Sequence, residues 1–77
     1  MTTPLNQVIA KVLRERPENI TDATSRKSHR RWDSFNHVQL VVHLEETYGV
    51  KLTNAEIEAL DSVAGVRTLL QTKGVAV

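Results

Sequence analysis

The stretch RRWDSFNHVQLVVHLEETYGV, residues 30–50, decides the fold of this 77-residue chain. Its apolar residues recur at the spacing of one helical face: Leu40, Val41, Leu44 and Tyr48. Asp33 precedes this pattern as a favourable helix cap, and Gly49 follows it, where a helix commonly ends. The stretch therefore predicts a helix that begins at Ser34 and is closed by Gly49.

A second apolar stripe runs beside this face of the predicted helix. It consists of Phe35, Val38 and Val42, at positions i, i+3 and i+7. Contact with a single core does not require so wide an apolar surface. Two interpretations stay open: the stripe is ordinary core, or it is exposed and a partner covers it.

A helix is also expected near the N-terminus. Its apolar face consists of Leu5, Val8, Ile9, Val12 and Leu13. Thr3 is its expected cap, Pro4 its first helical residue and Pro17 the residue that ends it.

The C-terminal third predicts a short helical segment around Ile57 and Leu60, then a last helix that Gly74 ends. The last helix has its apolar residues at Val63, Val66, Leu69 and Leu70. The candidate caps are Thr53 or Asn54 for the short segment and Asp61 or Ser62 for the last helix.

Residues 17–32 are expected to form a long loop, because they show no sustained period and are rich in Thr, Ser, Asn and Arg. Ile20 and Ala23 are expected to anchor it to the core. Loops longer than about 12 residues are often functional or mobile. The prediction is one domain over residues 1–77. Its fold class is all-α, a four-helix bundle with three main helices, one short helix and this long first connection.

The composition excludes several classes of function. The chain has no cysteine, which rules out disulfides, thiolate metal sites and thiol nucleophiles. The N-terminus lacks the pattern of an export signal, and no apolar run approaches the ~20 residues that span a bilayer. We expect a soluble monomer of the cytoplasm.

Serine and histidine do not form a catalytic or metal site in this pattern. Asp33 and Ser34 are sequence neighbours and cannot face each other across His37, as a catalytic triad requires. His37 and His43 are six residues apart and project in different directions from a helix. With His29, they are expected to be solvated or partly packed. We predict no catalytic residue, no metal site and no enzyme activity.

Four basic residues lie within six positions before the predicted helix: Arg26, Lys27, Arg30 and Arg31. Such a patch suits phosphate, nucleic acid or an acidic protein surface. Residues 32–50 contain no Lys or Arg, so no helix presents a basic face to a groove. A nucleic-acid or protein interaction module is kept as an alternative. For Ser34, a capping role and phosphorylation also stay open.

The segment WDSFNHVQLVVHLEETYGV, residues 32–50, resembles the attachment region of the acyl carrier protein family. That family has an Asp-Ser-Leu motif, an aliphatic helix, and an acidic pair and an aromatic residue at the end of the helix. The matching positions here are Asp33, Ser34, Phe35, Leu40, Val41, Leu44, Glu45, Glu46 and Tyr48. The expected order of helices and the long loop extend the resemblance over nearly the whole chain.

The resemblance implies that a phosphopantetheinyl transferase attaches 4'-phosphopantetheine from coenzyme A to Ser34, with magnesium held on the transferase. Asp33 belongs to the same motif. The arm ends in a thiol that carries an acyl group as a thioester. The implied partners are this transferase, a loading ligase or transferase, and downstream synthase enzymes, for all of which the chain is a substrate.

The residues around Ser34 are physically suited to an attached phosphodiester. As the first helical residue, Ser34 lies beside unpaired backbone amides and the positive end of the helix dipole. Asp33 opposes an anion there, and Arg30 or Arg31 would offset Asp33 if the loop folds back. Trp32 is expected to pack this loop onto the bundle.

The chain departs from the family pattern in two ways. Phe35 stands where leucine is commonest, and residues 35–44 contain no acid although the second helix of the family is usually acidic. Docking should therefore use apolar and neutral contacts or an acidic partner. The expected partner-facing residues are Phe35, Val38, Val42, Arg30 and Arg31. These departures favour a specialised pathway such as polyketide biosynthesis over fatty acid biosynthesis, with an aminoacyl or peptidyl carrier as the alternative.

Overall fold

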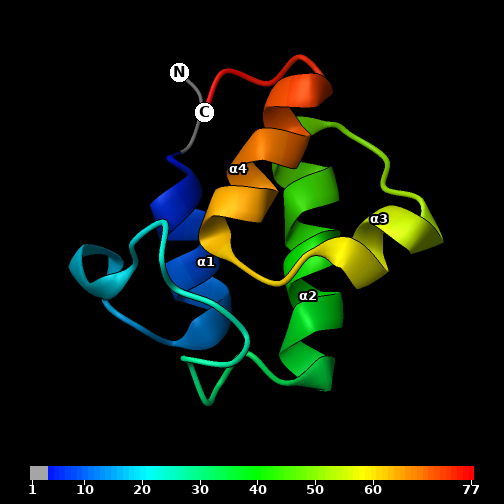
Figure 1. Ribbon diagram of the computed structural model, residues 1–77. Coiled ribbons are helices and arrows are strands. Elements are labelled where there is room, and N and C mark those ends of the chain that lie inside the picture. The colour runs from blue at the N-terminus through cyan, green and yellow to red at the C-terminus, as the bar shows by residue number, and fades with distance from the viewer. Residues whose placement is uncertain (1–3) are drawn as a thin grey trace.

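Helix α2, Ser34–Tyr48, is the longest helix of the computed structural model, which describes residues 4–77 (Figure 1). The Asp33 side chain caps it by accepting the Asn36 N–H at 2.8 Å. Gly49 closes it with a φ of 67°, a left-handed conformation that glycine adopts without steric cost. The predicted helix is confirmed at both ends.

Helix α1, Leu5–Leu13, buries all five apolar residues predicted for its face. Pro4 has an extended backbone and precedes the helix, so the prediction that it is the first helical residue is wrong by one position. The expected cap Thr3 lies outside the described residues.

Arg14, and not Pro17, ends α1. Its φ of 56° is left-handed, and the Glu15 N–H donates to the Ala10 carbonyl at 2.9 Å. Such a conformation is uncommon for a residue with a side chain, and no glycine marks the position in the sequence. Pro17 instead opens a short 3-10 turn, η1, Pro17–Asn19.

The two remaining helices follow the predicted pattern. Helix α3, Asn54–Ala59, begins with a capping box, in which Thr53 Oγ1 accepts the Glu56 N–H at 3.1 Å and Glu56 Oε1 accepts the Thr53 N–H at 2.8 Å. Helix α4, Val63–Thr72, is capped by Ser62, which accepts the Gly65 N–H at 3.1 Å. Of the candidate caps, Thr53 and Ser62 are the ones used.

Residues 20–33 form an irregular connection that is bound to the start of α4, where the Val63 N–H donates to the Thr24 carbonyl at 2.9 Å. Ile20 is buried as predicted. Ala23 is exposed, so its predicted anchoring role is wrong, and Thr24 is buried in its place. Burial of Thr24 is possible because its hydroxyl accepts the Thr21 N–H at 3.0 Å.

The core is aliphatic and lies between α1, α2 and α4. Its largest fully buried side chains are Ile9, Leu13, Leu40, Leu44, Val63, Val66 and Leu70. Trp32, only 2% exposed, joins this core from the loop and confirms that it packs the loop onto the bundle. Residues 4–77 contain helices and no strand, so the all-α bundle of three main helices and one short helix is confirmed.

Candidate functional site

Ser34 is the first residue of α2, and its side chain is exposed. Its hydroxyl makes no hydrogen bond to any residue in the range 4–77. The first backbone amides of a helix have no acceptor within the helix, and they give its N-terminus a partial positive charge. A negatively charged group joined to Ser34 Oγ would lie in this favourable field.

Hydrogen bonds fix how the chain enters α2. The Trp32 N–H donates to the His29 carbonyl at 3.0 Å, and Asn36 Nδ2 donates to the Arg31 carbonyl at 2.7 Å. Together with the buried indole of Trp32, these bonds hold the segment before the helix in one path. Ser34 is thereby presented on the outside of the bundle.

His37 is buried, at 5% exposure, although the sequence interpretation expected a solvated or partly packed side chain. The indole N–H of Trp32 donates to His37 Nδ1 at 2.9 Å, and His37 Nε2 lies 2.7 Å from the carbonyl oxygen of Ile57. A signal for this burial exists in the sequence. His37 precedes Leu40 and Leu44 by three and seven residues and therefore shares their face.

The other two histidines lie nearer the surface. His29 Nε2 is 3.3 Å from Glu15 Oε2, and His43 is half-buried on α2. The backbone N–H of Arg16, the Asn19 amide and His29 all bond to Glu15, and they lower its pKa from 4.5 to about 2. No group of His, Cys, Asp or Glu suited to a metal ion occurs among residues 4–77.

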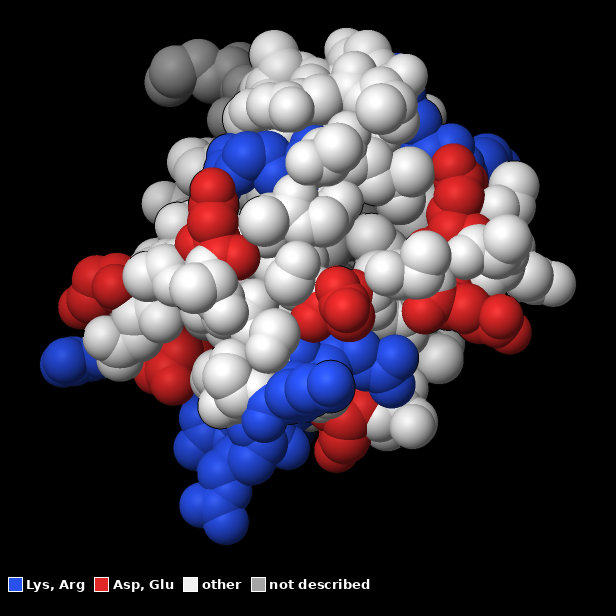
Figure 2. All heavy atoms as spheres, viewed as in Figure 1, with Lys and Arg blue, Asp and Glu red and all other residues white. Residues whose placement is uncertain are grey.

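Three arginines surround an open hollow of about 520 Å³ beside the start of α2. They are Arg14, Arg30 and Arg31, and we call them the arginine cluster. Phe35, Asp33 and Asn36 complete the lining. The Arg31 guanidinium donates to the Arg14 carbonyl at 2.7 Å, so the left-handed end of α1 helps to place this cluster. Figure 2 shows basic side chains gathered at this end of the molecule.

The basic run of the sequence is divided by the fold. The Arg26 N–H donates to the Asp61 carbonyl at 2.9 Å, which places Arg26 beside the start of α4. Arg30 and Arg31 instead join Arg14, a residue that the sequence pattern did not single out because it is distant in the chain. The electropositive region near Ser34 thus comes from two separate segments.

The second apolar stripe of α2 is exposed, so its interpretation as ordinary core is wrong. Phe35 is 70% exposed, Val38 57% and Val42 42%. We call these three residues the apolar face. Unpartnered apolar side chains in a row are typical of surfaces that bind another molecule. The face begins next to Ser34 and runs along α2 toward its C-terminal half.

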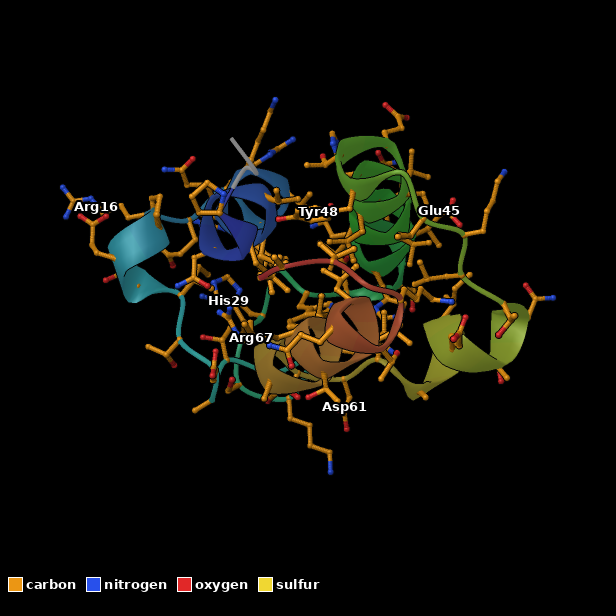
Figure 3. The ribbon with its side chains drawn as sticks, turned by 90° about the horizontal axis from the view of Figure 1, so that it is seen from above. Arg16, His29, Glu45, Tyr48, Asp61 and Arg67 are labelled. Atoms are coloured by element: carbon orange, nitrogen blue, oxygen red, sulfur yellow. The ribbon has the colours of Figure 1, made fainter. Side chains whose placement is uncertain are left out.

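Glu45 lies at the far end of this face, where Glu45 Oε2 accepts the Leu52 N–H at 2.9 Å. Figure 3 shows Glu45 on the side of α2 that faces the linker to α3, while Tyr48 lies between α1 and α2. The arginine cluster thus lies beside the Ser34 end of α2, whereas Glu45 and Glu46 lie near its other end, next to Lys51.

Comparison with known proteins agrees with this architecture. No family model matches the chain. A curated relative, "Polyketide-8 synthase acyl carrier protein 2" of Streptomyces avermitilis, is 32% identical over 69 residues, which are 90% of this chain and 79% of the relative. Among residues 4–77, every helix is too short or too polar to cross a lipid bilayer. The shared sequence and the helical bundle show that the chain belongs to the acyl carrier protein family.

Proposed function

We propose that this protein carries an acyl intermediate of polyketide biosynthesis as a thioester on a 4'-phosphopantetheine arm attached to Ser34. The observation that carries the proposal is the exposed, unbonded hydroxyl of Ser34 in the first turn of α2. The name of the Streptomyces avermitilis relative supports the polyketide assignment. The chain would be a substrate of its partner enzymes and not a catalyst.

The residues around Ser34 fit such an arm. Its Oγ would attack the phosphorus of coenzyme A that bears pantetheine. One O–P bond forms, the diphosphate P–O bond breaks, the adenosine nucleotide leaves, and the hydroxyl proton passes to a base of the transferase. The amides of the first turn and the arginine cluster supply positive charge around the resulting phosphodiester. When attached, the arm supplies the thiol that this cysteine-free chain lacks.

The apolar face and the arginine cluster form the proposed docking surface for synthase enzymes. Phe35 is the most exposed apolar side chain of this surface; it follows Ser34 in sequence and lines the same hollow as the arginine cluster. The first part of α2 has no acidic residue and therefore suits an apolar binding surface on the partner enzyme. Arg30 and Arg31 suit acidic groups at the edge of that surface. We further propose that residues 1–77 act as one monomeric carrier domain in the cytoplasm.

Intact mass spectrometry tests the attachment. The purified chain is incubated with coenzyme A, Mg²⁺ and a broad-range phosphopantetheinyl transferase, beside Ser34→Ala and the matched control Ser28→Ala, which alters an exposed loop serine. We expect one phosphopantetheine adduct on the wild type and on Ser28→Ala, and none on Ser34→Ala. An unmodified wild type, or an adduct on Ser34→Ala, would refute the assignment.

A further inference from the structure

His37 joins two parts of the molecule that are distant in sequence. On one side it accepts the indole N–H of Trp32 at 2.9 Å, and on the other its Nε2 lies 2.7 Å from the Ile57 carbonyl of α3. The rings of Trp32 and His37 are stacked, with centroids 6.3 Å apart and an angle of 27° between their planes. Both side chains are at most 5% exposed.

The two hydrogen bonds of His37 fix which of its ring nitrogens carries a proton. An indole N–H can only donate, so His37 Nδ1 must carry a lone pair and no proton. The single proton of the neutral ring then lies on Nε2 and is donated to the Ile57 carbonyl. Only this tautomer of His37 makes both bonds at once.

Helix α3 has few other attachments to the bundle. None of its six residues is buried, and Glu56 contacts Lys73 of the C-terminal segment at 3.1 Å. Among the hydrogen bonds between residues 4–77, the bond from His37 to Ile57 is the one that joins α2 to α3. The bond from His37 to Ile57 therefore helps to hold α3 against α2, together with Leu52 and Leu60, which flank α3 and pack on the core.

The linker into α3 runs beside the apolar face. The Leu52 N–H donates to Glu45, and Glu45 lines the same shallow hollow as Val42, which precedes it by three residues on α2. A shift of α3 would also displace this linker, which lies beside Val42. At the other end of the bridge, Trp32 stands two residues before Ser34.

From this geometry we infer that His37 is a positioning residue: its ring, protonated on Nε2 alone, couples α3, whose linker from α2 runs beside the apolar face, to the Trp32–Ser34 segment. The bridge itself is independent of the proposed function. Its effect on loading of Ser34 rests on that function, and the two are tested by separate measurements.

The first experiment reads the ring directly. In ¹⁵N NMR spectra of the wild type near neutral pH, His37 should show a protonated Nε2 and an unprotonated Nδ1. The indole proton of Trp32, the single tryptophan of the sequence, should exchange slowly in the wild type. Its signal should be absent from Trp32→Phe, which assigns it, and should shift in His37→Leu. A proton on Nδ1 of His37 would overturn the inference.

The second experiment measures amide hydrogen exchange in α3. His37→Leu removes both bonds and should speed exchange in α3 by about tenfold, the effect of losing one buried hydrogen bond. His37→Gln offers a donor near the Nε2 position and should restore most of the protection. His43→Leu, on the same helix but half-buried, is the matched control and should resemble the wild type.

Val66→Ala distinguishes the loss of the His37 bonds from a general loss of stability. It leaves a cavity in the core beside α4 and keeps both His37 bonds. If Val66→Ala speeds exchange in α3 as selectively as His37→Leu does, or if His37→Leu leaves α3 protected, the inference is overturned. We expect Val66→Ala to speed exchange throughout the bundle instead.

The third measurement is loading of Ser34 by the transferase. We expect His37→Leu to raise the KM for the carrier severalfold with little change in kcat, and His37→Gln to lie near the wild type. An unchanged KM in His37→Leu overturns the positioning role. A wild type that is not loaded at all refutes the proposed function instead, while the NMR and exchange results still decide whether the bridge exists.

Discussion

Asp33 combines two properties that substitution can separate, its capping oxygen and its charge. Its side chain accepts the Asn36 N–H at 2.8 Å. Asp33→Ala should lower the free energy of unfolding by about 1 kcal/mol, because α2 loses its cap, whereas Asp33→Asn retains a capping oxygen and should lose much less. Urea unfolding of the three proteins measures this difference. Equal losses for Ala and Asn would show that charge, and not the cap, is what matters.

Glu15 makes stability depend on acid pH. Its bonds to the Arg16 N–H, Asn19 and His29 lower its pKa from 4.5 to about 2 in the folded protein. Stability from these contacts is therefore fully present above pH 4.5 and is lost as the pH falls through about 2. Tm measured across this window should fall more steeply for the wild type than for Glu15→Gln.

The control for this experiment is Glu18→Gln, which replaces a nearby exposed carboxyl. It should keep the steep acid branch of the wild type. If Glu15→Gln and the wild type lose Tm in parallel below pH 4.5, the contacts of Glu15 do not contribute to folding.

At the scale of elements, substitutions on the two faces of α2 should change the free energy of unfolding by very different amounts. Phe35 is 70% exposed and Leu40 is fully buried. Phe35→Ser should change the free energy of unfolding by no more than about 0.5 kcal/mol, as is usual for surface positions. Leu40→Ala should cost about 2–5 kcal/mol because it leaves a cavity. Thermal and urea unfolding measure both, and a large loss in Phe35→Ser would mean that Phe35 packs inside the bundle.

Helical periodicity and caps were sufficient to predict the elements of this fold. Apolar spacing located the four α-helices of residues 4–77, and Asp33 and Gly49 marked both ends of α2. The end of α1 was missed because Arg14 adopts a left-handed backbone, in a place where its carbonyl accepts a bond from the distant Arg31. Local propensity contains no signal for such tertiary constraints.

The candidate site was predictable only in part. The sequence pointed to Ser34 as the exposed start of α2, but two tertiary features lay beyond it. Arg14 joins Arg30 and Arg31 only after the chain folds back. The burial of His37 was not predicted, because histidine is an unusual core residue. Its burial requires Trp32 as hydrogen-bond donor and a carbonyl of α3 as acceptor.

Over the whole molecule, charge is unevenly distributed although the net charge is only +1. The arginine cluster lies at the Ser34 end of α2, and Glu45 and Glu46 lie near its other end, where Lys51 is the neighbouring basic residue. A partner that binds along α2 should therefore present acidic groups near the Ser34 end of this helix. Long-range attraction of this kind acts mainly on the association rate and weakens as salt is added.

Arg30→Glu tests this polarity against Lys27→Glu. Both residues are exposed, but Arg30 lines the hollow beside Phe35, whereas Lys27 adjoins Arg26, whose backbone is bound at the start of α4. The association rate of each phosphopantetheinylated variant is measured with a polyketide synthase enzyme that accepts the wild-type carrier, at low and at high salt. Arg30→Glu should slow association on the order of tenfold at low salt, and the difference should shrink as salt screens it. Lys27→Glu should have a smaller effect. Faster association of Arg30→Glu, or equal effects of the two substitutions, would contradict an acidic docking partner at the Ser34 end of α2.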